Sequence, residues 1–338
     1  MRQPPRTRRR AVAAALATSL GAAMFVSPSS VAATRPGLSV ITEPAAGMGF
    51  VARAVESARH LVLLEVYELE DPAVVAALVA RARSHVTVEV LLDKDYHAGT
   101  VNSRAFATLR AGHVAVRWTA ASYIFHEKAL VIDGATAYVG TGNLTSQYYA
   151  TTRDFWVVDS IGADATAITA GLRADWRGDA PSPAPRGADL VWSPGAEATV
   201  IGLIDGARHT VSLESEELAA DPVVNALVAA AHRHVAVRVT MTYSSSWRWA
   251  FNELVAAGAQ VHVDHGESPI YIHAKALCID CVLGSHGAGT VLVGSHNLST
   301  YSLTRNRELS IRTTAPSVVQ PIAAVLRSDF VAASRYLG

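Results

Sequence analysis

The stretch His126-Glu-Lys128-Ala-Leu-Val-Ile-Asp133 returns 147 positions later as His273-Ala-Lys275-Ala-Leu-Cys-Ile-Asp280. In both copies a histidine and a lysine stand two residues apart at the start of an apolar run of strand length. Alternate residues of a strand share a face, so we expect the imidazole and ammonium groups of each copy to point the same way. The lysines also stand out because the 338-residue chain contains only one other, Lys94.

The repeat extends well beyond this motif. Ala58-Arg-His60 and the apolar run after it return at Ala207-Arg-His209, and Asp71-Pro72 returns at Asp221-Pro222, with offsets of 149 and 150 residues. A period this long indicates two homologous halves, not a solenoid of short repeats. We expect an N-terminal half over 34–179, a Pro-rich linker over 180–189 and a C-terminal half over 190–338.

Strands and helices are expected to alternate within each half. Asp71 followed by Pro72 is a good helix start, and its copy marks the same point in the second half. Apolar runs of four to eight residues indicate strands, and alternation of such runs with helices predicts an α/β fold with helices on the sheet faces. The expected helices are 72–83 and 221–232, and the expected strands are 61–66, 86–92, 129–132, 137–139, 155–158, 210–213, 235–240, 276–279, 291–293 and 309–312.

Residues 1–33 are expected to be a secretory signal peptide. A basic start precedes an apolar stretch over 11–26 that is short for a membrane span, and small residues follow at 31–33. Thr7-Arg8-Arg9 leaves room for twin-arginine export, and an uncleaved anchor is the alternative. Without this segment, which holds five arginines and no acidic residue, 24 basic and 29 acidic residues remain. Bulk charge therefore gives no support to a nucleic-acid partner.

The two cysteines, Cys278 and Cys281, lie three positions apart at the end of the second motif. Residues three apart on a strand point to opposite faces. We therefore favour buried free thiols over a disulfide, which would need a turn directly after Asp280. A metal site is least favoured, because the chain has no second cysteine pair.

Each motif is followed by a glycine-rich turn that ends in asparagine, Gly140-Thr-Gly-Asn143 and Gly294-Ser-His-Asn297. Glycine lets a backbone approach a ligand closely, and the segments after the turns look like helix starts, which favour anions. A carboxylate comes next in both halves. Asp154 lies 28 residues after His126, and Glu308 lies 35 after His273, of which seven belong to an insertion around 284–289.

The duplicated residues would place two imidazoles, two ammonium groups and two amides around one anion. This set suits a phosphodiester, because a neutral imidazole can attack phosphorus while a protonated one supplies a proton to the leaving oxygen. Lys128 and Lys275 would offset charge on the non-bridging oxygens, and Asn143 and Asn297 would donate hydrogen bonds to the phosphate.

The repeated carboxylates are expected to have two kinds of role. Asp154 and Glu308 would orient the imidazoles and raise their basicity, as the third member of a catalytic triad does. Asp133 and Asp280 end the motif strands, so we expect them to support the catalytic site from a turn or cap and not to bind metal. No metal and no other cofactor is expected.

The pattern His-x-Lys-x4-Asp followed by Gly-Ser/Thr-x-Asn, twice in one chain, resembles the phospholipase D superfamily over residues 45–335. The resemblance implies two homologous α/β/α halves related by a pseudo-twofold axis, each with a mixed central sheet flanked by helices. It also implies an active site at their interface and a metal-free phosphohistidine mechanism, with His126 as nucleophile and His273 as acid and base. Thr141 departs from the usual serine of the first glycine-rich turn.

Three classes of function remain open. A secreted phospholipase D, which hydrolyses head groups at a membrane or vesicle surface and can pass the phosphatidyl group to alcohols, agrees best with the expected export and acidic charge. A secreted metal-independent nuclease of the same superfamily would stack bases on aromatic side chains. A binding module without activity is disfavoured, because both motif copies are complete. No obligate protein partner is expected. Aromatic residues near the motifs could line the site or simply pack in the core; they are Tyr123, Tyr271, Trp247 and Trp249.

Overall fold

The computed structural model describes residues 37–95, 98–119, 123–179, 189–266, 268–284 and 289–338. The expected signal peptide and all but the last residue of the expected linker lie outside these ranges. The features described below belong to one unit, residues 32–338. Among the described residues, no helix is long and apolar enough to cross a lipid bilayer.

The first half is built on a mixed sheet. Its strands lie in the order β1 (Leu38–Glu43), β7 (Thr152–Asp159), β6 (Thr136–Gly140), β5 (Lys128–Ile132), β2 (Leu61–Val66), β3 (Thr87–Leu92) and β4 (Ala115–Trp118). The pairs β2–β3 and β3–β4 are parallel, and the other neighbours in this order are antiparallel. The first motif forms β5 at the centre of the sheet, where both faces are buried and all five residues are inaccessible to solvent.

The second half repeats this order element for element. Its strands are β8 (Leu190–Ser193), β15 (Glu308–Thr313), β14 (Thr290–Gly294), β13 (Lys275–Ile279), β9 (Thr210–Ser215), β10 (Ala236–Thr242) and β11 (Gln260–Asp264), with β16 (Ser334–Arg335) added beyond β11. The second motif forms β13, the counterpart of β5. The expected duplication and the mixed character of both sheets are therefore confirmed.

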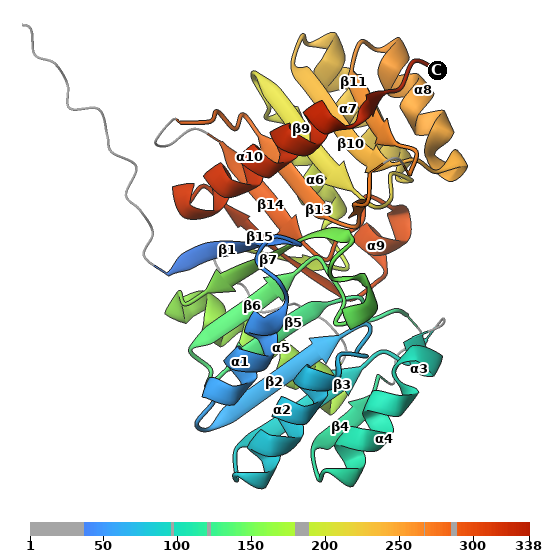
Figure 1. Cartoon of the computed structure of the whole chain (residues 1–338). Coiled ribbons are helices and arrows are strands. Elements are labelled where there is room, and N and C mark those ends of the chain that lie inside the picture. Colours follow the sequence, from blue (N-terminus) through green and yellow to red (C-terminus); the bar gives the residue numbers. More distant parts are fainter. Residues whose placement is uncertain (1–36, 96–97, 120–122, 180–188, 267, 285–288) are drawn as a thin grey trace, which may run out of the picture. The chain divides into compact units, whose positions relative to one another are not determined.

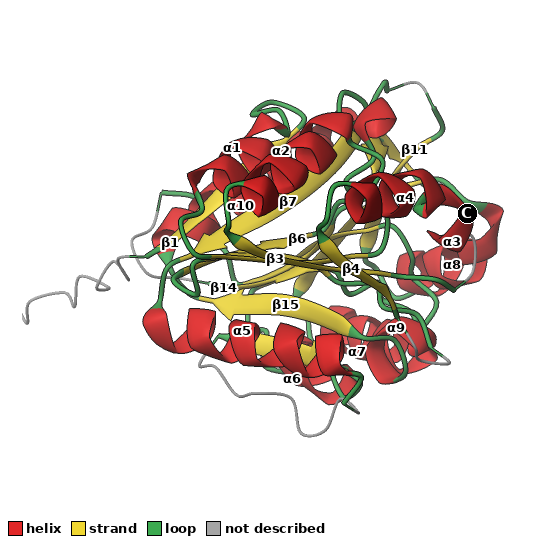
Figure 2. Ribbon diagram, turned by 90° about the horizontal axis from the view of Figure 1, so that it is seen from below, coloured by secondary structure: helices red, strands yellow, loops and turns green. Residues whose placement is uncertain are grey.

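Helices cover both faces of the sheets (Figures 1 and 2). The first half contributes α1 (Gly49–Ser57), α2 (Pro72–Arg83), α3 (Ala98–Val101), α4 (Ser103–Ala111) and α5 (Gly162–Arg177), and the second contributes α6 (Glu197–Asp205), α7 (Asp221–His232), α8 (Arg248–Ala256), α9 (Thr300–Thr304) and α10 (Pro316–Ala332). Asp71 caps α2 by accepting a hydrogen bond from Ala73 N at 2.7 Å, and Pro72 fits the first turn. Both predicted helices have the expected bounds.

The hydrophobic core joins the two halves. One cluster of buried side chains lies under α1, α2 and α4, and another lies under α6, α7 and α8. A third contains residues from both halves, including Phe155 of β7, Leu309 of β15, Ile168 of α5 and Ile322 of α10. Because burial of apolar surface is the main favourable term in folding, this shared cluster holds the halves together as one unit.

The segment in front of each motif histidine reaches the other half. The short strand β12 (Tyr271–Ile272) pairs in parallel with Thr152 and Arg153 at the start of β7. At the equivalent position of the first half, Phe125 forms a parallel bridge to Arg307, and His126 N donates to Arg307 O at 2.9 Å. Each histidine is thereby tied to the strand of the other half that carries a carboxylate.

Asp133 and Asp280 follow the motif strands in left-handed conformations, with φ of +53° and +51°. The carboxylate of Asp133 accepts hydrogen bonds from the backbone N–H groups of residues 59–61, at 2.7 to 3.1 Å. Asp280 accepts the same set from residues 208–210. Strands rise roughly 3.3 Å per residue, so each aspartate lies roughly 16 Å from its motif lysine. The two aspartates stabilise the ends of the motif strands that lie away from the pocket, and they do not reach a substrate.

The preference for free thiols at Cys278 and Cys281 is wrong, because the two cysteines form a disulfide with a Cα–Cα distance of 5.8 Å. The left-handed conformation of Asp280 ends the strand between them. The rule that residues three apart point to opposite faces therefore does not apply here, and the turn brings the two sulfur atoms together.

We expect Asp133→Asn to lower the free energy of unfolding by about 1–3 kcal/mol, because an amide leaves backbone donors without a charged acceptor. Burial opposes ionisation, but the backbone donors of Leu61, His60 and Arg59 lower the pKa of Asp133. A lowered pKa means that the stabilisation exists above the ordinary aspartate pKa and is lost as pH falls through the lowered value. Urea unfolding at pH 7 and pH 3 measures both effects.

The control is Glu56→Gln on an exposed face of α1, which should change the unfolding free energy by less than about 0.5 kcal/mol. Equal stability of Asp133→Asn and the parent at pH 7 would contradict the supporting role.

Candidate active site

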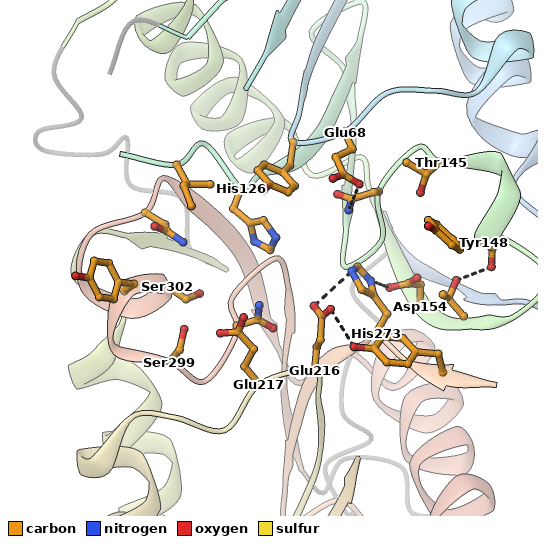
Figure 3. A pocket seen from close by; sticks show the side chains of 18 of the residues that line it. Glu68, His126, Thr145, Tyr148, Asp154, Glu216, Glu217, His273, Ser299 and Ser302 are labelled. Carbon is orange, nitrogen blue, oxygen red and sulfur yellow. Dashed lines mark hydrogen bonds and ion pairs between the residues drawn. The ribbon is translucent and has the colours of Figure 1, made fainter. Parts of the chain in front are cut away.

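A cavity of about 780 Å³ opens where the two motifs meet (Figure 3). Its lining comes from both halves and is rich in tyrosine and carboxylate side chains. The predicted residues His126, Asn143, Asp154, Tyr271, His273 and Asn297 line it, together with Tyr67, Glu68, Ile124, Thr145, Tyr148, Tyr149, Thr151, Thr152, Glu216, Glu217, Ser299, Tyr301, Ser302 and Asn306. The duplicated residues thus meet in one pocket.

Each histidine is paired with the carboxylate of the other half. His126 Nδ1 donates to Glu308 Oε2 at 3.0 Å, and His273 Nδ1 donates to Asp154 Oδ1 at 2.9 Å. Sequence spacing had placed one histidine and one carboxylate in each half but could not show this exchange. A carboxylate at Nδ1 leaves Nε2 of the ring pointing to the pocket, where it can take or give a proton.

The carboxylates are themselves held by hydroxyl groups. Thr141 Oγ1 donates to Asp154 Oδ1 at 2.5 Å, and Ser302 Oγ donates to Glu308 Oε1 at 2.7 Å. A Cβ at Gly142 would lie 2.7 Å from the Asp154 carboxyl group, so this turn position requires glycine. Thr141, which replaces the usual serine of the turn, therefore keeps the hydroxyl group that holds the Asp154 carboxylate.

The first histidine is suited to act as a neutral base or nucleophile. Burial, assisted by the charge of Lys128, lowers the pKa of His126 to about 4. Burial also opposes ionisation of Glu308, yet its hydrogen bond with His126 and the nearby Lys128 hold the pKa of Glu308 at about 2. At neutral pH the pair is a carboxylate next to a neutral imidazole.

Both motif lysines are almost inaccessible to solvent, and each lies next to its motif histidine behind the pocket lining. Lys128 Nζ donates to His126 O at 2.6 Å, and Lys275 Nζ donates to His273 O at 2.5 Å. Burial and the charge of Lys275 lower the pKa of Lys128 to about 7. Two ammonium groups that repel each other in a buried position form a ready receptor for one phosphate anion.

The halves differ at one pair of equivalent positions, Tyr67 at the end of β2 and Glu216 at the end of β9. The Tyr67 ring lies 5.3 Å from Lys128 Nζ and 4.9 Å from the His126 ring. Glu216 instead accepts from Lys275 Nζ at 2.8 Å, and its Oε2 lies 3.4 Å from His273 Nε2. Burial opposes ionisation of Glu216, but His273 and Lys275 hold the pKa of Glu216 well below its usual range.

The asparagines of the glycine-rich turns lie in the pocket as expected. Asn143 Nδ2 donates to Glu68 Oε2 at 3.1 Å. Asn297 is 6% exposed, and within the described part of the chain its Oδ1 atom has no hydrogen-bond partner. The helix starts expected after these turns are short, since one is the 3₁₀ turn Ser146–Tyr148 and the other is the five-residue α9. Their contribution to anion binding is correspondingly small.

Three of the four predicted aromatic lining residues lie outside the pocket lining. Tyr123 stacks on Phe125 with ring centroids 5.4 Å apart. Trp247 packs against the core of the second half, and Trp249 projects from α8 with 37% exposure. Only Tyr271 lines the pocket, where its hydroxyl donates to Glu216 Oε1 at 3.3 Å. The packing alternative was therefore correct for Trp247.

Sequence reasoning missed the three glutamates of the pocket, Glu68, Glu216 and Glu217. The sequence does repeat this glutamate pattern. The last residues of β2 and β9 and the two residues after them read Glu65-Val-Tyr-Glu68 and Glu214-Ser-Glu-Glu217. Parallel bridges from Leu69 to Leu144 and from Leu218 to Leu298 then join these strand ends to the glycine-rich turns.

Two arginines, of which Arg307 is buried and Arg153 half-buried, connect the halves. Arg307 contacts Asp175 of α5 at 2.8 Å and Glu127 at 3.1 Å, and Arg153 contacts Asp329 of α10 at 3.0 Å. Glu127 and Asp175, together with Glu65, are close enough to share a cation. Arg307 already supplies that cation, so this cluster is a structural ion-pair network and not a site that needs metal.

A family model described as cardiolipin synthase, PLD-like domain, matches the chain twice, over residues 51–176 and 200–330. The chain belongs to the phospholipase D superfamily. The two matched stretches correspond to the two halves of the fold. The superfamily is one of phosphodiesterases, and the chain belongs to it. The resemblance inferred from the motifs is therefore confirmed, as is the fold class.

Members of the superfamily with curated or solved examples include the major cardiolipin synthase ClsA of Bacillus subtilis, 24% identical over 269 residues. The match covers 66% of this chain and 55% of that protein, so the chain spans about half the length of this relative. Two crystal structures share the fold. Polyphosphate kinase from Porphyromonas gingivalis has a TM-score of 0.66 and 17% identity, covering 90% of this chain and 52% of that one. Phosphatidylserine synthase from Haemophilus influenzae has a TM-score of 0.65 and 9% identity, covering 89% and 87%.

The crossed pairs predict which histidine each carboxylate controls. Glu308→Gln should lower kcat on a phosphodiester by about 10²–10⁴-fold, because the positive imidazole formed at His126 loses its counter-charge. The charge of Glu308 raises the His126 pKa, so its removal should shift the His126 titration further below pH 4. Histidine-resolved NMR titration measures the shift.

Asp154→Asn is the matched control, since it should lower kcat comparably and leave the His126 titration in place. The crossed arrangement is contradicted if Asp154→Asn moves the His126 titration and Glu308→Gln does not.

Proposed function

We propose that this chain is a secreted, metal-independent phosphodiesterase that hydrolyses phospholipid head groups through a phosphohistidine intermediate. One observation carries the proposal, namely two histidine–carboxylate pairs that face one pocket, each with a buried motif lysine next to its histidine. Superfamily membership and the name of the cardiolipin synthase relative support a phospholipid substrate.

The contacts of the two rings give them different roles. A neutral imidazole has one N–H donor, whereas an imidazolium has two. Asp154 lies 2.9 Å from His273 Nδ1, and both Glu216 at 3.4 Å and Lys275 Nζ at 3.2 Å lie beside His273 Nε2. The two carboxylates can offset the positive charge of the ring when it carries the proton that the leaving oxygen needs. Among the described residues, Glu308 is the one carboxylate within ion-pair distance of His126. We therefore assign His126 Nε2 as the nucleophile and His273 as the general acid.

In the first step His126 Nε2 forms a bond to phosphorus, and the bond from phosphorus to the head-group oxygen breaks. His273 gives its Nε2 proton to that oxygen, so the head group leaves as a neutral alcohol function. Lys128, Lys275 and the Asn143 amide would stabilise charge on the non-bridging oxygens. Both ammonium groups are buried, where the effective dielectric constant is lower than in water. The attraction between each ammonium group and the phosphate is therefore stronger than it would be at the surface.

In the second step His273, now neutral, takes a proton from a water molecule whose oxygen attacks phosphorus. The bond to His126 breaks and phosphatidic acid leaves. An alcohol in place of water would give transfer of the phosphatidyl group, and the name of the cardiolipin synthase relative supports this second outcome. Export is proposed from residues 1–33 alone.

A nuclease is the weaker candidate. A polynucleotide brings several negative charges, and the pocket already holds Glu68, Glu216 and Glu217. A lipid brings one phosphodiester, and the tyrosines of the lining offer apolar ring surface with polar tips, which suits an interface between lipid and water.

Purified protein lacking residues 1–33 should release head groups from phospholipid vesicles and leave single-stranded DNA uncut. The activity should persist in millimolar EDTA, because ammonium and imidazole groups supply the charge stabilisation and proton transfer. Choline or ethanolamine release and gel electrophoresis measure the two reactions side by side.

His126→Asn and His273→Asn are the controls, and each should lower turnover by at least about 10³-fold. DNA cleavage with intact lipid would overturn the phospholipid assignment, and loss of activity in EDTA would overturn the metal-free mechanism.

A further inference from the structure

The resting pocket holds a carboxylate where the phosphate is expected to bind. Glu216 Oε2 lies 2.8 Å from Lys275 Nζ and 3.4 Å from His273 Nε2, the two groups that the mechanism assigns to the phosphate and the leaving oxygen. Figure 3 shows Glu216 directly below His273 and next to Glu217. A phosphodiester can use Lys275 only by taking the place of this carboxylate.

Displacement leaves the Glu216 carboxylate, whose side chain is 25% exposed, without its ammonium partner. Loss of this charge-assisted contact opposes binding, so a substrate that carries a replacement cation binds more favourably. Glu216 contacts the proposed general acid His273, and the replacement cation therefore belongs on the leaving alcohol. The equivalent position in the first half, Tyr67, has no charge, so this requirement exists on the His273 side alone.

The neighbouring lining suits such a cation. Glu217 follows Glu216 in the wall of the pocket, and the Tyr271 hydroxyl donates to Glu216 Oε1 at 3.3 Å. Carboxylates and a tyrosine face are the groups that bind ammonium ions. Burial raises the pKa of Glu217, a cost that a bound cation would relieve.

An independent observation indicates the type of cation. The Oδ1 atom of Asn297 is buried, lines the same pocket and has no donor among the described residues, as is also true of the Asn143 Oδ1 atom in the first half; Asn297 is the one on the Glu216 side. An N–H bearing ammonium group satisfies such an acceptor, whereas a quaternary ammonium group has no proton to donate.

We propose that Glu216, Glu217, Tyr271 and Asn297 form a leaving-group subsite that binds a primary ammonium group on the alcohol, as in an ethanolamine head group. This inference rests on the proposed phospholipase function. It separates this chain from enzymes whose exchanged head group is neutral or anionic.

The test compares phosphatidylethanolamine, phosphatidylcholine and phosphatidylglycerol, each at the same mole fraction in micelles of a neutral detergent. We expect kcat/KM for phosphatidylethanolamine to exceed that for phosphatidylglycerol by at least tenfold, and to exceed that for phosphatidylcholine severalfold. Glu217→Gln should lower the phosphatidylethanolamine value by about tenfold and leave the phosphatidylglycerol value within about twofold.

Glu70→Gln is the matched control. Glu70 is exposed, follows strand β2 of the first half and is not part of the pocket lining. The substitution should leave all three values unchanged. Hydrolysis of bis(4-nitrophenyl) phosphate, which has no ammonium group, should be the same in Glu70→Gln and the parent. Circular dichroism of Glu217→Gln should match the parent, which verifies an intact fold.

Equal cleavage of all three lipids, or an equal loss on all three in Glu217→Gln, would overturn the subsite and leave the proposed function standing. A preference for phosphatidylcholine equal to that for phosphatidylethanolamine would overturn the primary-ammonium assignment. Cleavage of no lipid, with the nitrophenyl ester still hydrolysed, would overturn the phospholipase function and this inference with it.

Discussion

The exchange of carboxylates between the two halves is the constraint on which the rest of the structure depends. His126 is held by Glu308 and His273 by Asp154, and each pair requires that a segment from one half lies against a strand of the other. The β12–β7 pairing and the Phe125–Arg307 bridge supply that contact. In both halves the carboxylate at Nδ1 of the motif histidine comes from the other half. The site is therefore complete only when both sheets fold as one unit around their shared core.

A duplicated chain gives a symmetric site, but the proposed reaction needs two different histidines. The structure departs from symmetry at Tyr67 and Glu216, which occupy equivalent strand ends and contact equivalent lysines. A carboxylate lies beside Nε2 of the His273 ring and an aromatic face lies beside the His126 ring, so the two histidines have different electrostatic surroundings. One pair of positions thus accounts for the division of roles and for the preference that we propose for a charged leaving group.

Much of this could be predicted from the sequence because the repeat reports the same information twice. The motif strands, the helices after Asp71 and in the second half, and the convergence of the histidine, lysine and asparagine residues followed from local pattern and spacing. The disulfide could not be predicted, because the left-handed conformation that brings the cysteines together occurs at Asp280 and not at a glycine, which would have indicated a turn. The crossing of the carboxylates could not be predicted either, since spacing along the chain is identical whether a carboxylate serves its own half or the other. The aromatic residues near the motifs in sequence were poor guides, because whether a ring faces the pocket depends on packing between distant elements.

The claim that two halves form one site with unequal histidines is tested most directly by trapping the covalent intermediate. Bis(4-nitrophenyl) phosphate is suited to this, because nitrophenolate leaves without a proton from His273. Mass spectrometry of a rapidly denatured His273→Asn reaction should find the phosphoryl modification on the peptide that contains His126, and Glu308→Gln should slow its formation. A modification on His273 in the His126→Asn protein, formed at the same rate, would contradict the account.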